Sequence, residues 1–511
     1  MRRTRTVAAI LLLAIRADAQ PEPSDLVRAG RALAASRLEE AGPLIEQLER
    51  SRPDDPRVLG LSAELRLQRG DLSEAAALVR RAVAALPDDE PIAAISARIE
   101  AAARVTKGFT ESRGGGLVVR HPPGRDSVLV PYVRETLEAQ ARAVALDLGD
   151  RPAFPVVVEI LPDGHSLSAI TGLPLADIER TGTIAVSKWG RLFVVSPRAL
   201  ARGYPWLDTL AHEWVHLIVT RRTDDRAPIW LQEGIAKFEE RRWRDLPGGR
   251  LEPVLGALLD RAIAADRLLP FARFHPSIAK LGSQEEAGLA FAEAFTFVRF
   301  LHERVGFEGL RDLLERVRSG RDATDAVADV VRAPWPTVQS WWRGELAVRR
   351  STSPGALRLL AVRLRGRGAV DETNDIAEEA ARRHARLGDL LRERGRTRAA
   401  AIEYGAAARK APGDPIVANR LARALLDTGQ AGLVAEALRQ PTLLYPAFPA
   451  SHVHLGSAHA ALGHEGPAIT AFEEAIRLSP FDPEPHCALA SLYADDDRRV
   501  RREEEACLLL R

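Results

Sequence analysis

The feature that most constrains the fold of this chain is a period of 34 residues in its C-terminal third. Three glycines recur at this period, and so do three prolines. They are Gly395, Gly429 and Gly463, and Pro412, Pro446 and Pro480. A fixed period of this length is typical of a helix–turn–helix unit that buries its apolar face by stacking on further copies. The period predicts an array of helix pairs, with a short or kinked helix in the middle copy, where Pro441 falls inside the second helix.

The same period occurs near the N-terminus. Pro53 and Pro87 are 34 residues apart, and each opens a Pro-Asp-Asp turn. Both segments resemble tetratricopeptide repeats, and residues 24–105 are predicted to form two repeats and a capping helix. The resemblance implies that these surfaces bind protein partners. Because short arrays need neighbours to bury their faces, we expect both to pack on the central part of the chain.

The central part has a different pattern. The runs Leu117–Arg120 and Phe154–Ile160 are rich in β-branched residues and predict strands, whereas Pro131–Leu148 has helical periodicity. From Pro253 to Val348 the pattern is helical, with amphipathic stretches at 290–305 and 310–317. Three tryptophans in this region are interpreted as packing anchors, with a substrate subsite as the alternative. They are Trp335, Trp341 and Trp342.

A cluster of metal-binding residue types lies between these two halves. His212 and His216 are four residues apart in an apolar helical stretch, so both imidazoles can face one ion. Glu233 follows 17 residues after His216. Two imidazole nitrogens and one carboxylate leave a tetrahedral zinc ion one position for water, and Glu213 can act on that water as a general base. The pattern predicts Zn²⁺ as the cofactor; the alternative is a pair of ordinary histidines near a helix carboxylate.

This motif, with the segment Trp230–Ala236 around Glu233, is similar to the gluzincin clan of zinc metallopeptidases, and most of all to "peptidase MA-like" domains. The resemblance covers about residues 107–350. It implies His212, His216 and Glu233 as zinc ligands and Glu213 as the catalytic base. It also implies an edge strand that pairs with an extended peptide substrate. Gly190–Val195, after Thr183–Val186 and a turn at Lys188–Gly190, is our candidate; the alternative is a plain pair of core strands.

The chain departs from this family in three places. Related peptidases carry a tyrosine after the third ligand to stabilise the oxyanion, but the corresponding stretch Leu289–Phe295 has only phenylalanine. His275 and His302 are alternative donors, although the simpler interpretation makes them surface or core histidines. No segment that would hold a substrate amino terminus is present, which favours an endopeptidase. Lys237 stands where thermolysin-like enzymes have an aspartate, so the carboxylate that orients the ligands is not identified.

Two functions follow from these observations. The first is a zinc-dependent endopeptidase whose repeats recruit a peptide or protein substrate or a partner. The alternative is a catalytically weak or inactive scaffold for protein–protein interaction in the cell envelope. The charges nearly cancel, with 72 basic and 70 acidic residues, and give no reason to expect nucleic-acid binding.

The two ends of the chain bear on its location. Met1–Thr6 is basic, residues 7–15 are apolar, and Ala17-Asp18-Ala19 offers a cleavage site, which together predict a signal peptide and export to the bacterial periplasm or beyond. The apolar run is too short to span a bilayer, and an uncleaved short anchor is the alternative. Cys487 and Cys507 are expected to form either one disulfide or two separate buried thiols.

The sequence therefore predicts a multidomain, mainly α protein. A central α+β gluzincin-type metallopeptidase domain with a helical C-terminal subdomain is flanked by α-helical repeat arrays. The predicted bounds are a signal peptide at 1–19, N-terminal repeats at 20–106, the α+β subdomain at 107–245, its helical subdomain at 246–350 and C-terminal repeats at 351–511.

Overall fold

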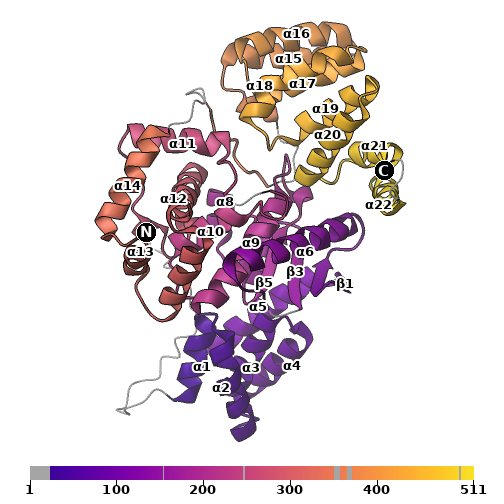
Figure 1. Cartoon of the computed structure of the whole chain (residues 1–511). Coiled ribbons are helices and arrows are strands. Elements are labelled where there is room, and N and C mark those ends of the chain that lie inside the picture. Colours follow the sequence, from indigo (N-terminus) through magenta and orange to yellow (C-terminus); the bar gives the residue numbers. More distant parts are fainter. Residues whose placement is uncertain (1–23, 153–154, 246–247, 350–356, 365–370, 494–496) are drawn as a thin grey trace, which may run out of the picture.

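A computed structural model describes residues 24–152, 155–245, 248–349, 357–364, 371–493 and 497–511. The predicted signal peptide lies outside these residues. The described chain is mainly helical, with one small mixed sheet, so the predicted fold class is confirmed. The N-terminal helices, the sheet with its helices and the C-terminal helices follow one another along the long axis of the molecule (Figure 1). None of the described helices is both long enough and apolar enough to cross a membrane.

The N-terminal part consists of two helix pairs and a fifth helix, as predicted. These helices are α1 (Asp25–Ala34), α2 (Leu38–Ser51), α3 (Pro56–Arg69), α4 (Leu72–Ala85) and α5 (Glu90–Thr106). The turns that contain the two Pro-Asp-Asp motifs end in helix caps, because the side chains of Asp55 and Asp89 accept hydrogen bonds from the first turns of α3 and α5. The helix α5 packs on α7 (Gly164–Thr171) of the central part, as expected for a short array.

The sheet has five strands in the order β1-β2-β3-β5-β4. They are β1 (Thr110–Gly114), β2 (Leu117–His121), β3 (Val156–Leu161), β4 (Ala185–Lys188) and β5 (Arg191–Val195). The three central strands are parallel, and the two outer ones run antiparallel to their neighbours. Strand β1 was not predicted, because Thr110–Gly114 is polar and largely exposed.

The prediction that Gly190–Val195 forms the edge strand is wrong, because this segment is the neighbouring strand β5. All five residues of β5 are buried, because β5 pairs with β3 on one side and β4 on the other. The edge is β4, which precedes the turn at Trp189-Gly190. A hairpin pattern does not reveal which of its two strands joins the rest of the sheet, since that strand pairs with residues 34 positions earlier in the sequence.

Helices pack around the sheet and beyond it. The helix α6 (Leu129–Leu148) packs on α9 (Trp206–Thr223), and α9 contacts β4 and β5. After α8 (Leu175–Thr181) and α9 come the helices of the predicted helical subdomain. They are α10 (Ile229–Glu239), α11 (Pro253–Ala264), α12 (Gln284–Arg318), α13 (Ala323–Val331) and α14 (Trp335–Val348). The backbone of α12 is broken at Gly306, between the two stretches that were predicted to be amphipathic.

The tryptophans near the end of this region are only partly packing anchors. Trp335 and Trp342 pack against Phe271 and Phe297, and Trp342 is buried. Trp341 is 46% exposed, so the prediction is wrong for this residue. Its exposure follows from its position, since it precedes the buried Trp342 by one residue and therefore points about 100° away around the helix.

An extended segment, residues 357–364, connects the central part to the C-terminal helices. The side-chain amide of Gln284 bonds both backbone groups of Val362, at 2.7 and 3.0 Å. An isolated β-bridge between Leu200 and Leu364 adds a second contact, with the part of the chain that carries the sheet. The segment therefore lies against the start of α12 and the chain that leads into α9.

The C-terminal helices form the predicted array of pairs. They are α15 (Glu379–Glu393), α16 (Thr397–Lys410), α17 (Pro415–Asp427), α18 (Val434–Leu444), α19 (Pro449–Ala461), α20 (Glu465–Leu478), α21 (Pro483–Leu492) and α22 (Asp497–Leu510). The helix α18, which contains Pro441, has 11 residues against 14 in α16 and α20, as predicted. Cys487 and Cys507 form a disulfide between α21 and α22, which decides between the two alternatives.

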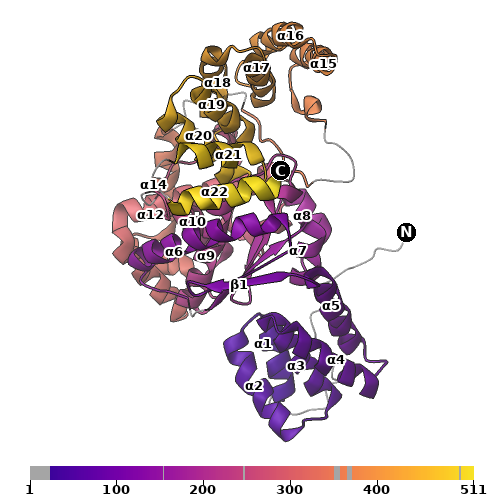
Figure 2. The same cartoon turned by 90° about the vertical axis from the view of Figure 1, so that its right-hand side faces the viewer.

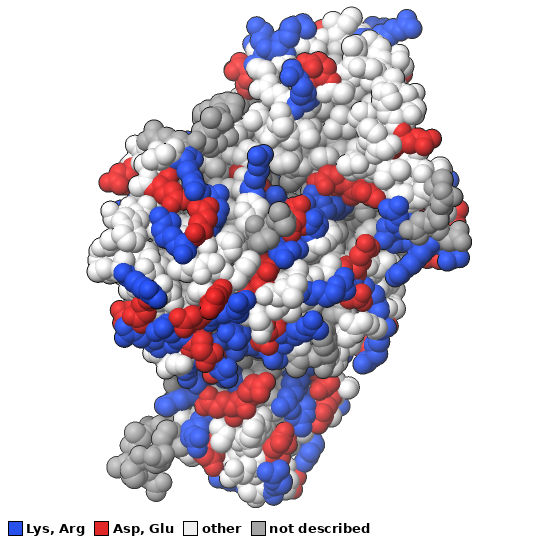
Figure 3. All heavy atoms as spheres, in the orientation of Figure 1, with Lys and Arg blue, Asp and Glu red and all other residues white. Residues whose placement is uncertain are grey.

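The last helix of this array lies along the central part (Figure 2). The hydroxyl of Tyr132 on α6 donates to the buried carboxylate of Glu503 on α22, at 2.8 Å. His486 on α21 bonds the same carboxylate at 2.6 Å. Acidic and basic side chains are interspersed over the face drawn in Figure 3, in keeping with the near-balanced composition.

Candidate metal centre

The two histidines of the motif lie on one face of α9. This helix is buried along most of its length, and Trp206 and Trp214 are among the largest fully buried side chains of the protein. Because His212 and His216 are one turn apart, their rings lie together, with centroids 4.8 Å apart. Packing on both sides of α9 fixes the direction in which these rings point.

The helix α10 brings Glu233 to the same place. It follows α9 after a short connection, and Pro228 immediately precedes its first residue. The Glu233 Oε2 atom lies 3.2 Å from the His212 Nε2 atom and 3.5 Å from the His216 Nε2 atom, and the two Nε2 atoms are 3.1 Å apart. The structure therefore brings together the three residues that the sequence pattern selected.

These separations fit a tetrahedral metal ion. Donor atoms at zinc bond lengths of about 2.0–2.1 Å lie about 3.3–3.4 Å apart at the corners of a tetrahedron. The three measured separations, 3.1, 3.2 and 3.5 Å, are close to this value. The donor set, two imidazole nitrogens and one carboxylate oxygen, is also one that zinc accepts.

The charges around the three donors favour a cation between them. Burial lowers the pKa of His212, but hydrogen bonds to Glu233 and Glu240 outweigh it and raise that pKa to about 10. Burial raises the pKa of Glu233, but the two neighbouring imidazoles outweigh it and hold this pKa well below its usual range. The site therefore stabilises positive charge on His212 and negative charge on Glu233.

Glu213 lies beside this cluster, on the side that faces the edge of the sheet. Potential ligand atoms of His212, Glu213 and His216 all lie within 4.8 Å of one another. Burial raises the pKa of the Glu213 carboxyl group. The backbone N–H of Ser187 in the edge strand β4 faces this carboxylate and offsets part of the increase in its pKa. Glu213 is thus held between the two histidines and the edge of the sheet.

A carboxylate that supports His212 is present, although it was not predicted from the sequence. The Glu240 Oε2 atom lies 3.5 Å from His212 Nδ1, on the opposite side of the ring from the three-donor cluster. Lys237 Nζ holds the other oxygen of Glu240 at 2.7 Å. A carboxylate at this place fixes the ring orientation of a histidine ligand. The signal in the sequence was the spacing of seven residues from Glu233, which is two helical turns and returns to the same face.

The position expected to hold a tyrosine is occupied by phenylalanine. The ring of Phe291 on α12 packs edge-on against His212, with centroids 6.0 Å apart. Of the two alternative donors, His275 is exposed, and His302 packs between Phe238 and Phe307. Both positions agree with the simpler interpretation, a surface histidine at 275 and a packed histidine at 302. The wall of the site at Phe291 is apolar.

One turn before His212, α9 carries a buried carboxylate with several cationic partners. Asp208 is 2% exposed and accepts hydrogen bonds from Arg244 at 2.6 and 3.0 Å and from Trp243 at 3.1 Å. Arg477 of the C-terminal array pairs with it at 3.0 Å. This network connects the helix of the motif to the chain after α10 and to the C-terminal repeats.

The fold and this site define a metallopeptidase-like domain placed between helical repeats. A family model of the Peptidase MA superfamily matches residues 139–347, and a tetratricopeptide-repeat model matches residues 32–99. The chain therefore carries a Peptidase MA superfamily domain and tetratricopeptide repeats. The match to the Peptidase MA superfamily includes His212, Glu213, His216 and Glu233, and also Glu240.

Similarity to solved structures is low. Native LTA4 hydrolase from yeast is 12% identical, over 79% of this chain and 66% of that chain, with a TM-score of 0.32. The APC/C hetero-tetramer Cut9-Hcn1 is 13% identical, over 95% and 78%, with a TM-score of 0.27. The first tetratricopeptide domain of Spaghetti (RPAP3), bound to an HSP90 peptide, is 16% identical, over 26% and 97%, with a TM-score of 0.21. No curated protein matches the chain.

Proposed function

We propose that the protein is a zinc-dependent endopeptidase in which His212, His216 and Glu233 hold Zn²⁺. The observation that carries this proposal is the convergence of their three donor atoms within 3.1–3.5 Å, with Glu213 beside them. When bound in such a site, zinc polarises a carbonyl group and lowers the pKa of water to about 7.

Glu213 acts as the general base. Its carboxylate takes a proton from the attacking water and later delivers it to the leaving amine. Burial supports this role, because a raised carboxyl pKa makes the carboxylate a stronger base near neutral pH. The N–H of Ser187 supports it too, because a donor from the rigid sheet fixes the direction in which the carboxylate points.

The edge strand β4 binds the substrate backbone. The N–H of Val195 donates to the carbonyl of Ile184, and hydrogen-bonded pairs alternate along an antiparallel ladder. The backbone groups of Ala185 and Ser187 therefore face away from β5, toward the open edge. An extended peptide added at this edge lies beside Glu213, so its carbonyl carbon is within reach of the activated water.

The repeats recruit the substrate or a partner, and the protein works outside the cytoplasm. Tetratricopeptide repeats present surfaces for protein segments, and the N-terminal array packs next to the sheet through α5 and α7. The disulfide between Cys487 and Cys507 supports export to the periplasm or beyond, because such bonds persist in oxidising compartments.

One observation favours the alternative function, a weakly active or inactive scaffold. Phe291 offers no hydroxyl group at the wall of the site, and loss of one oxyanion donor costs about a hundredfold or more in rate. The buried, oriented carboxylate of Glu213 argues for catalysis, because a scaffold has no use for it.

A peptide library tests the two functions. The zinc-loaded protein is incubated with the library beside two variants, Glu213→Gln and Glu233→Gln, and an exposed control, Glu285→Gln. We expect cleavage by the wild type and the control, full zinc content without cleavage in Glu213→Gln, and loss of zinc from Glu233→Gln. Cleavage by Glu213→Gln refutes its role as base, and no cleavage by any folded, zinc-loaded protein favours the scaffold.

A further inference from the structure

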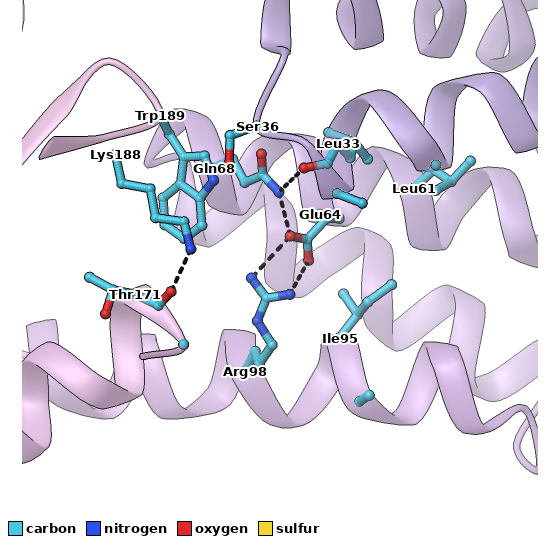
Figure 4. Close-up of a pocket in the computed structure, with 14 residues that line it drawn as sticks. Leu33, Ser36, Leu61, Glu64, Gln68, Ile95, Arg98, Thr171, Lys188 and Trp189 are labelled. Atoms are coloured by element: carbon cyan, nitrogen blue, oxygen red, sulfur yellow. Dashed lines mark hydrogen bonds and ion pairs between the residues drawn. The ribbon is translucent and has the colours of Figure 1, made fainter. Parts of the chain in front are cut away.

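A cavity of about 200 Å³ lies between the N-terminal repeats and the turn that joins β4 to β5 (Figure 4). The helices α1, α3 and α5 contribute one wall, which includes the apolar side chains of Leu33, Leu61 and Ile95. The end of α7 and the turn residues Lys188 and Trp189 contribute the opposite wall. The cavity thus combines a repeat surface with the end of the edge strand.

The charged groups in this cavity do not cancel. Glu64 and Arg98 form a two-bond ion pair with each other, at 3.0 and 3.1 Å. Lys188 donates to the backbone carbonyl of Thr171 at 2.7 Å and lies 4.5 Å from the centre of the Trp189 ring. No carboxylate in the described part of the chain forms an ion pair with it. The lining therefore carries one positive charge that lacks a counter-charge.

This uncompensated charge is unfavourable in the protein alone. Burial, with the repulsion of Arg98, lowers the pKa of Lys188 to about 8, and Glu64 offsets this only in part. A buried ammonium group is stabilised by an anion at hydrogen-bonding distance. The Thr171 carbonyl uses one of its three N–H groups.

Two further polar groups of the lining have no hydrogen-bond partner among the described residues. They are the Nε1 atom of Trp189, whose side chain belongs to a residue 7% exposed, and the Oε1 atom of Gln68, a residue 3% exposed. A buried donor or acceptor without a partner costs about 1–3 kcal/mol, so such groups are rare unless a ligand or water satisfies them. Among the described residues, this cavity therefore has one hydrogen-bond donor and one acceptor without a partner.

The backbone at Trp189 is unusual as well. Trp189 and Gly190 have φ angles of 57° and 71°, the left-handed values of a two-residue hairpin turn that favours asparagine and glycine. A bulky residue in this conformation is uncommon and unfavourable. The ring of Trp189 packs on Phe193 and forms part of the wall of the cavity.

We propose that this cavity binds a peptide segment through a carboxylate, which accepts hydrogen bonds from Lys188 Nζ and Trp189 Nε1, while an apolar side chain packs on Leu61 and Ile95. The carboxylate belongs either to a free C-terminus or to an acidic side chain.

This inference rests on the proposed function in one respect, that the segment is part of a substrate. Lys188 directly follows Ser187, whose N–H reaches Glu213, and consecutive Cα atoms are about 3.8 Å apart. A peptide that lies along the edge of β4 therefore enters the cavity a few residues from the bond to be cleaved. The cavity selects substrates with a carboxylate at that distance.

Binding to the full, zinc-loaded chain carrying Glu213→Gln tests the proposal without cleavage. Three fluorescent seven-residue probes are compared by anisotropy: a leucine–alanine peptide with a free C-terminus, the same peptide as its amide, and the amide with one internal aspartate. We expect at least one carboxylate probe to bind tenfold or more tighter than the plain amide. The probe that binds more tightly identifies whether the carboxylate is a free C-terminus or an acidic side chain.

Variants at the cavity then locate the binding. Lys188→Met should abolish the preference for carboxylate, whereas the exposed control Lys107→Met should keep it. Ser36 lines the cavity with a φ of 58°, a conformation that aspartate and asparagine tolerate. Ser36→Asp should weaken carboxylate binding at least fivefold, and the neutral, similarly shaped Ser36→Asn should not. This pair keeps the test valid if Lys188→Met fails to fold.

Two results overturn the proposal: carboxylate probes that bind no tighter than the plain amide, or a preference that survives both Lys188→Met and Ser36→Asp. Neither result depends on cleavage, so failure here is distinct from failure of the peptidase assignment. In the active enzyme, Lys188→Met should raise KM for carboxylate-bearing substrates.

Discussion

Arg477 of the C-terminal repeats pairs with Asp208 of α9, 3.0 Å from nitrogen to oxygen, one helical turn before His212. Two more contacts lie next to it, because the backbone N–H of Tyr204 donates to Leu478 at 2.9 Å and Trp206 Nε1 donates to Ile476 at 3.3 Å. The helix α20 thus rests on the first turn of the helix that carries the histidines.

Replacement of Arg477 by methionine tests how much this contact stabilises the protein. Asp208 keeps Arg244 and Trp243 as partners, so its carboxylate is not left alone. We expect the unfolding free energy to fall by about 1–2 kcal/mol, the net value of a buried hydrogen bond to a charged group. Urea unfolding measures the change. Arg439→Met, which removes an exposed pair with Glu436, should cost less than about 0.5 kcal/mol; equal losses in the two variants contradict the prediction.

Glu240→Gln should weaken zinc binding by about 10- to 100-fold. The amide keeps the size of the side chain but removes the negative charge that orients His212 through its Nδ1 atom. Competition with a fluorescent chelator measures the zinc affinity. Glu285→Gln is the exposed control and should bind zinc like the wild type. An unchanged affinity in Glu240→Gln means that packing alone fixes the His212 ring.

The buried ammonium group of Lys188 predicts how stability depends on pH. Its pKa is about 8 in the folded protein, because of burial and the nearby Arg98, against 10.5 for an ordinary lysine. Between these values the unfolded chain binds a proton that the folded chain does not, so the unfolding free energy rises with pH across this window. Relative to Lys188→Met, the rise should reach at most about 3 kcal/mol.

Urea unfolding of the wild type and Lys188→Met at pH 7, 8, 9 and 10 isolates this effect, because other groups titrate equally in both proteins. Arg98 and Glu64 are the charged groups that face Lys188. A difference between the two proteins that stays constant from pH 7 to pH 10 contradicts the prediction.

Phe291→Tyr should raise kcat at least tenfold if the oxyanion forms against this ring. The ring already packs on His212, and the added hydroxyl supplies a hydrogen-bond donor at an apolar wall. Zinc content should stay the same. Phe291→Leu, which adds no donor, should show no gain. An unchanged kcat in Phe291→Tyr, with zinc bound, places the oxyanion elsewhere.

The parts of the site that depend on one helix or one short connection were predictable from the sequence. The helical spacing of His212 and His216 places both on one face, and the short connection to α10 returns Glu233 to them. The repeats were predictable for the same reason, because a period such as that of Gly395, Gly429 and Gly463 indicates a helix pair formed by residues close in sequence.

What depended on long-range pairing was not predictable. The hairpin pattern identified both strands, but only the pairing of β5 with β3 shows that β4 is the edge. Glu240 was not predicted because it lies seven residues from Glu233, whereas the aspartate of thermolysin-like enzymes lies four residues after the third ligand. The cavity at Lys188 joins two walls more than 70 residues apart in sequence, such as those of Arg98 and Thr171, and no local pattern predicts that they meet.

The C-terminal array is attached to the central part through two of its helices, by the contacts of α20 and of α22. A cut in the connection between Leu364 and Glu379 would therefore produce two fragments that remain together and migrate as one particle in gel filtration. Nicked and intact protein would differ only on a denaturing gel. A protease that encounters this connection would leave the assembly in one piece.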